Sequence, residues 1–119
     1  MRLLAVCMDG DIVITEAPEK LDPQSLLEKL DLAGCGAVVS FLGITREYDE
    51  GKEIYRLEFD AWQEKLGSVL YNLAEEVIIK FGVKKVAISH RTGSVKAGEN
   101  IVSIHVASPH RKAVSYTHI

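Results

Sequence analysis

Three apolar segments of this chain end in cationic side chains. These cations are the residues that could bind an anion or transfer a proton. They are Arg46, His90-Arg91 and His110-Arg111. Arginine presents a planar fork of donors that suits a phosphate or a carboxylate, and a histidine beside it can donate to an anion or move a proton near neutral pH. Because the chain as a whole is acidic, with a net charge of -3, three such segment ends favour a local anion site.

Arg46 and the His110-Arg111 pair each have a structural interpretation as well. Acidic residues follow Arg46 and could balance it at a solvated strand end, but Gly43 leaves room for a ligand and favours anion binding. His110 and Arg111 follow Pro109 near the end of the chain, so a frayed exposed segment and an anion site are equally supported by the pattern.

Two further residues are assigned structural roles. Arg91 stands in a tight turn before Gly93, where it is expected to tie the turn to a carboxylate rather than to act in catalysis. His105 lies inside an alternating strand pattern and is interpreted as a sheet histidine with satisfied hydrogen bonds rather than a ligand.

The sequence contains none of the common metal or cofactor motifs. The four histidines and two cysteines lack HExxH or CxxC spacing, and there is no P-loop, dinucleotide fingerprint or GxSxG nucleophile motif. We therefore expect no metal and no cofactor. Cys7 and Cys35 are expected to be reduced thiols of a cytoplasmic protein, without a catalytic role.

Length and composition predict one globular domain over residues 1–119, with 112–119 frayed at the end. Hydrophobic residues make up 47% of the chain, which is enough for a packed core. The acidic balance excludes a general nucleic-acid binder, and no apolar run reaches the length of a membrane span. The apolar start at 1–8 is interpreted as a strand rather than a signal peptide.

The periodicity predicts two helices and a largely antiparallel sheet, which is the α+β class. Helical spacing predicts a long helix over 64–81 ended by Gly82, and Asp22 begins a shorter helix that ends at Gly34. Strands are expected over 3–8, 12–15, 36–46, 53–62, 84–90 and 100–108. The runs 36–46 and 53–62 are expected to form a long hairpin across a polar turn.

The order of these motifs resembles the large, catalytic subunit of molybdopterin synthase, the MoaE family. The resemblance covers about residues 12–111 of the chain. Each motif alone is weakly specific, whereas their order and spacing together are specific. The matching stretches are Gly36-Ala37 with 41–46, Leu57 to Trp62, His90 to Gly93, Gly98-Glu99 and His110-Arg111.

The resemblance implies an α/β-hammerhead fold and a homodimer that binds two copies of a small ubiquitin-like sulfur carrier of the MoaD family. It implies that the carrier's C-terminal thiocarboxylate enters a pocket on this subunit. The implied reaction is a sulfur transfer to cyclic pyranopterin monophosphate, which gives the dithiolene of molybdopterin without a metal. The expected location is the cytoplasm, with neither nucleic acid nor membrane as a partner.

Position by position, Arg46 matches the family's substrate-anion arginine, and Phe41 matches an aromatic residue near the carrier tail. His110 and Arg111 match a pair that reaches the neighbouring protomer's pocket across the dimer interface. The family carries two lysines in a helix and tail beyond this pair, and neither has a counterpart before Ile119. The resemblance therefore assigns no catalytic residue in this chain. A catalytically impaired binding and dimerisation module of the same family, or an unrelated small phosphate-binding α+β protein, stay open as alternatives.

Overall fold

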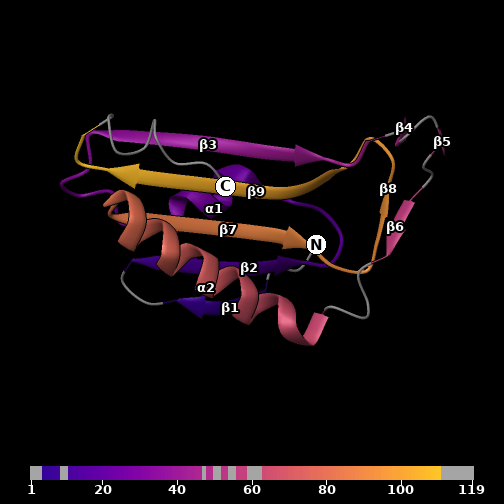
Figure 1. Ribbon diagram of the computed structural model, residues 1–119, viewed down its shortest axis with the longest axis horizontal. Coiled ribbons are helices and arrows are strands. Elements are labelled where there is room, and N and C mark those ends of the chain that lie inside the picture. Colours follow the sequence, from indigo (N-terminus) through magenta and orange to yellow (C-terminus); the bar gives the residue numbers. More distant parts are fainter. Residues whose placement is uncertain are drawn as a thin grey trace.

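The computed structural model describes residues 4–8, 11–46, 48–49, 52–53, 56–58 and 63–110. They form an α+β fold in which a five-stranded sheet lies between two helices (Figure 1). In the order in which they lie side by side, the strands of this sheet are β1 (Leu4–Met8), β2 (Ile12–Ala17), β7 (Lys85–Arg91), β9 (Asn100–Ser108) and β3 (Ala37–Ile44).

Three of the four strand pairs in this sheet are antiparallel. β1 pairs with β2, β7 with β9, and β9 with β3 in this way, whereas β2 and β7 run parallel. The parallel pair places the ends of β2 and β7 at the same end of the sheet as the end of β3 and the start of β9. The predicted class, α+β with a largely antiparallel sheet and two helices, is confirmed.

The long helix α2 (Gln63–Phe81) covers one face of the sheet. Its buried residues Leu66, Leu70, Ala74 and Val77 pack against apolar strand residues such as Ile88. Gly82 ends the helix with a positive φ of 69°, and its N–H donates to the Ile78 carbonyl over 2.9 Å. This is the predicted glycine stop. Among the described residues, no helix is both long and apolar enough to cross a membrane.

The short helix α1 (Pro23–Glu28) covers part of the opposite face. The Asp22 carboxylate accepts the Ser25 N–H over 3.1 Å, so the predicted N-cap is confirmed. The predicted end at Gly34 is wrong, because the helix stops at Glu28. The Asp31 carboxylate accepts the Ala33 N–H over 3.0 Å, and this local turn competes with continued helix.

The predicted long hairpin between 36–46 and 53–62 is also wrong. β3 pairs along its length with β9, and the described residues between 46 and 56 form the two-residue strands β4 (Tyr48–Asp49) and β5 (Lys52–Glu53), which pair with each other. The end of the second predicted run, 59–62, lies outside the described residues. β6 (Arg56–Glu58) pairs instead with β8 (Ser94–Lys96). An eight-residue ladder that also completes the core outweighs the proximity of two neighbouring segments.

Two glycines in and before β3 allow it to approach β9 closely, and they make different contacts. A Cβ added at Gly36 would lie 2.6 Å from the Pro109 carbonyl oxygen, and one at Gly43 would lie 2.6 Å from a methyl of Val102. The Val102 side chain can rotate away, but a backbone oxygen moves only with the chain.

We predict that Gly36→Ala lowers the free energy of unfolding by about 1–3 kcal/mol and that Gly43→Ala lowers it by less, as measured by urea denaturation. Equal losses would contradict this explanation.

Candidate functional site

One end of the sheet brings together the ends of β2, β7 and β3 and the start of β9, on the right of Figure 1. Two backbone hydrogen bonds hold Thr45 there. Its N–H donates to the Glu99 carbonyl over 2.9 Å, and its carbonyl accepts the Gly98 N–H over 2.8 Å. Arg46 follows Thr45 directly and is exposed, so its guanidinium starts from an anchored position at this end of the sheet.

A pocket of about 370 Å³ opens at the same end of the sheet. Its wall combines two cations with two carboxylates and an amide, so it offers donors and acceptors to a small polar ligand. Lys20 is exposed, whereas Arg91 is buried. The lining residues are Glu19, Lys20, Leu21, Arg91, Gly98, Glu99 and Asn100.

Arg91 joins the segments that form this pocket. Its Nε donates to the Ala17 carbonyl and one terminal nitrogen donates to the Ser94 carbonyl, each over 3.1 Å. The other terminal nitrogen lies 3.9 Å from a Glu99 carboxylate oxygen. These contacts tie the end of β2 to β8 and the following turn, so the predicted structural role of Arg91 is confirmed. Two of its three nitrogens thus donate to backbone carbonyls of the fold.

Phe41 lies near the middle of β3, on the same strand as the approach to Arg46. It is opposite Ile104 of β9, and 36% of its surface is exposed. β3 is an edge strand of the sheet, and its other exposed apolar residues are Val38, Leu42 and Ile44. The structure therefore places Phe41 on an open, mostly apolar edge.

His110 lies at the opposite end of β3 from Arg46. Ala37 at the start of β3 is paired with Ser108, and the exposed His110 follows two residues later. An eight-residue strand spans about 25 Å at the usual rise per residue. One chain thus does not bring Arg46 and His110 together. Arg111 lies outside the described residues.

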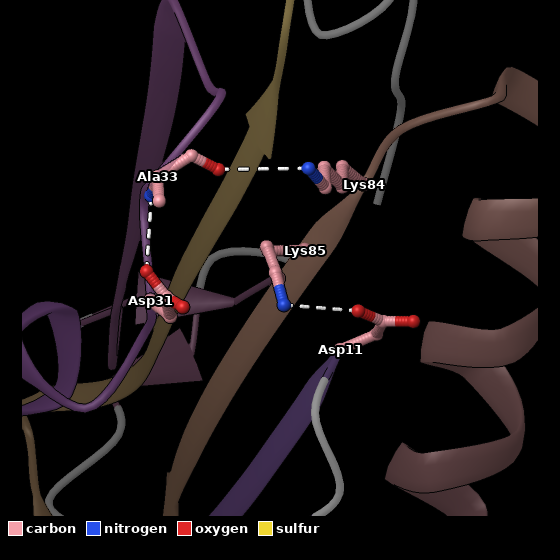
Figure 2. A network of polar contacts seen from close by, with 5 residues as sticks. All are labelled: Asp11, Asp31, Ala33, Lys84 and Lys85. Carbon is pink, nitrogen blue, oxygen red and sulfur yellow. Dashed lines mark hydrogen bonds and ion pairs between the residues drawn. The ribbon is translucent and has the colours of Figure 1, made fainter.

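The end of the sheet near His110 also holds a small network of polar contacts, which Figure 2 shows. Lys85 Nζ donates to the Asp11 carboxylate over 2.9 Å, and Lys84 Nζ donates to the Ala33 carbonyl over 3.5 Å. The hydrogen bond to Asp11 raises the pKa of Lys85 above its ordinary value, against the opposing effect of burial. This lysine is therefore engaged in a structural ion pair.

Asp11→Asn tests this ion pair through its pH dependence. Because the pKa of Lys85 is raised in the folded state, the ion pair stabilises the protein below the ordinary lysine value of 10.5, and this contribution is lost as the pH rises through the folded pKa. We predict that the variant has a lower urea midpoint at neutral pH and that its difference from the wild type shrinks in strong alkali. Glu76→Gln, the same charge change on the exposed face of α2, is the matched control. A difference that is constant with pH would exclude the ion pair as its cause.

The structure also shows the state of one cysteine and the arrangement of the possible metal ligands. Cys35 is half-buried and unpaired by any disulfide, and the side chain of Cys7 lies outside the described residues. Within the described parts of the chain, no three histidine, cysteine, aspartate or glutamate side chains cluster as metal ligands.

Sequence reasoning missed four members of the pocket wall. Glu19, Lys20 and Leu21 lie in the connection after β2, and Asn100 is the first residue of β9. None of them was singled out as a site residue. Glu99 could have been found from the sequence, because Gly98-Glu99 is one of the stretches that carry the family resemblance. Only the pairing of distant strands shows that these residues share one pocket.

Comparison with known proteins identifies consistent relatives. The family model described as MoaE protein matches residues 16–117. A molybdopterin synthase catalytic subunit of Bacillus subtilis (strain 168) is 35% identical over 100 residues, which are 84% of this chain and 62% of that protein. The human protein of the same name is 33% identical over 108 residues, covering 87% of this chain and 57% of the relative. The chain thus spans somewhat over half the length of these relatives.

Solved structures give the same result. The crystal structure of molybdopterin synthase from Staphylococcus aureus superposes with a TM-score of 0.73 at 28% identity, covering 92% of this chain and 77% of that one. A complex of subunits 1 and 2 of molybdopterin-converting factor from Helicobacter pylori 26695 matches with a TM-score of 0.61 at 25% identity, covering 86% and 69%.

Proposed function

The chain belongs to the MoaE protein family, and from this premise we propose that it acts as the large subunit of a molybdopterin synthase. In this role it takes sulfur from the thiocarboxylated C-terminus of a small ubiquitin-like carrier and transfers it to cyclic pyranopterin monophosphate, so it is a sulfurtransferase of molybdenum cofactor biosynthesis. The single observation that carries the assignment is the family match over 16–117, joined to the anchored Arg46.

The substrate chemistry fits the end of the sheet that holds Arg46. A pterin phosphate and a carboxylate-like carrier tail are both anions, and fixed cationic donors bind such groups most strongly. Arg46 and Lys20 are exposed there, beside a pocket whose polar wall includes Asn100. Arg46 is assigned to the substrate anion, and Phe41 on the same strand is assigned to the carrier tail.

His110 and Arg111 are assigned to the substrate site of a second copy. His110 lies about 25 Å from Arg46 along β3, so one chain cannot place both on one small molecule. If two copies pair antiparallel along their β3 edges, the Arg46 end of one strand faces the His110 end of the other. β3 suits this pairing, because it is an edge strand with exposed Val38, Leu42 and Ile44. The site is then shared, and each dimer carries two such sites with one carrier each.

The dimer is tested by a charge placed on β3. We predict that the wild type sediments as a dimer and that Leu42→Lys, at a residue that is 48% exposed, shifts it to a monomer without loss of fold. Ile79→Lys introduces the same side chain on α2, at a residue that is 83% exposed, and should leave the dimer intact. A monomeric wild type, or a dimer broken only by Ile79→Lys, would remove β3 as the interface.

The function is tested by a single-turnover assay. The chain is mixed with thiocarboxylated carrier and cyclic pyranopterin monophosphate, and molybdopterin is followed as its oxidised fluorescent derivative.

We predict that Arg46→Ala weakens binding of the pterin phosphate by about tenfold or more while the fold persists, because a charge-assisted contact to an anion is lost. Lys65→Ala, which removes an exposed cation from α2, is the control and should bind as the wild type does.

The outcomes separate the three candidate functions. Product formation supports the sulfurtransferase. Binding of both carrier and pterin without product favours a binding and dimerisation module of the same family. If neither the carrier nor the pterin binds, a simple phosphate-binding protein becomes the better explanation. If Arg46→Ala retains full affinity for the pterin phosphate, the assignment of Arg46 to the substrate fails.

A further inference from the structure

The pocket at the end of the sheet is lined by an arginine that keeps an unused hydrogen-bond donor. Arg91 is only 5% exposed, and its Nε and one terminal nitrogen donate to backbone carbonyls. Its other terminal nitrogen, Nη1, lies 3.9 Å from Glu99 Oε2, which is too long for a hydrogen bond. Buried polar groups normally have partners, so an unused donor on a buried guanidinium in a pocket wall favours a ligand.

Glu99 supplies an acceptor beside this donor. Its Oε1 accepts the Lys96 N–H over 2.8 Å, which holds the carboxylate in place. Its Oε2 makes no hydrogen bond within the described residues, and 44% of the side chain is exposed, so a ligand can reach it. The side chains of Lys20 and Asn100 line the same pocket, and neither has a partner in the described part of the chain. Donors and acceptors of both charges therefore converge on one space.

A buried histidine of the same sheet shows the contrast. His105 is 4% exposed, with its Nδ1 2.6 Å from Ser40 Oγ and its Nε2 2.8 Å from the Pro23 carbonyl oxygen. Both ring nitrogens have partners inside the chain, which confirms the prediction of a satisfied sheet histidine. The polar groups of the pocket are not satisfied in this way.

The charges and size of the pocket indicate the class of ligand. Lys20 and Arg91 are cationic and Glu19 and Glu99 are anionic, so the formal charges of the wall cancel. A phosphate would face both carboxylates, and a simple cation would face both positive side chains, whereas a zwitterion can satisfy both signs. The volume of about 370 Å³ is at the lower end of ligand pockets, which span about 300–1,000 Å³, so the ligand is small.

We propose that this pocket binds a free α-amino acid with a small side chain. The ligand carboxylate accepts from Arg91 Nη1 and Lys20 Nζ, and its ammonium group donates to Glu99 Oε2. An α-amino acid carries both groups on one carbon, which matches a donor and an acceptor only 3.9 Å apart. Leu21, the one aliphatic side chain in the wall, contacts the ligand side chain.

This inference is independent of the proposed sulfur transfer. The pterin phosphate is assigned to Arg46, which does not line the pocket. The balanced charges of the pocket favour a ligand without net charge, whereas the substrate assigned to Arg46 is an anion. Binding of an amino acid can be measured on the chain alone, without carrier or pterin.

The test compares three compounds that differ in charge. The full chain, labelled with ¹⁵N, is titrated with free L-alanine, with N-acetyl-L-alanine, which lacks the ammonium group, and with L-alanine methyl ester, which lacks the carboxylate. A slightly acidic pH keeps the amino group of the ester charged. We expect saturable shifts of the Gly98 and Asn100 backbone amide signals with L-alanine, and at least about tenfold weaker binding of each analogue, because each loses charge-assisted contacts.

One variant assigns the acceptor. Glu99→Gln keeps an oxygen for the Lys96 N–H and removes the charge, so it should weaken L-alanine binding by about tenfold and abolish the preference over N-acetyl-L-alanine. Glu76→Gln, the same change on the exposed face of α2, is the matched control and should bind as the wild type does.

Three results would overturn the proposal. They are no saturable shift with L-alanine, equal affinities for the three compounds, and unchanged affinity in folded Glu99→Gln. If Glu99→Gln does not fold, the comparison of the three compounds on the wild type still decides.

Discussion

The pairing of β9 along both of its edges is the constraint on which the rest of the molecule depends. Ile104 is in register with Ile88 on one side and with Phe41 on the other. A shift of one residue would turn the apolar residues of β9 away from α2 and bring His105 into the core, so the register is fixed by burial. The same register sets which strand ends meet and which serine faces His105. The core, the end of the sheet that holds Arg46, and the contact between Ser40 and His105 are thus three results of one alignment.

Cations at the ends of the sheet differ in their burial. Arg91 is buried and donates to backbone carbonyls, and Lys85 is buried and paired with Asp11. A buried charge without such partners would be strongly destabilising, so these contacts are conditions of folding. Arg46 and Lys20 are exposed at the end of the sheet that holds the pocket. Glu19 and Glu99 also line this pocket, so its charge is mixed.

The sequence predicted the features that depend on neighbouring residues and failed where distant segments compete. The Asp22 cap and the Gly82 stop act within one helical turn, and both were found from the residues alone. The end of α1 was missed because a side chain, Asp31, redirects the backbone. The hairpin was wrong because β3 gains more from β9 than from the segment that follows it. Arg46 was singled out from the sequence as a cation at a strand end, but its separation from His110 follows only from strand order.

The strand order also determines how the chain can reach its fold. β2 cannot form its ladder before β7 is present, because Ile14 pairs with Ile88. β3 likewise needs β9, because Phe41 pairs with Ile104. Ladders between such distant residues require large loops to close before their contacts contribute, so folding is limited by chain entropy rather than by helix formation. During synthesis the apolar strand β3 leaves the ribosome long before its partner exists. Until β9 is made, this strand is open to association with other nascent chains.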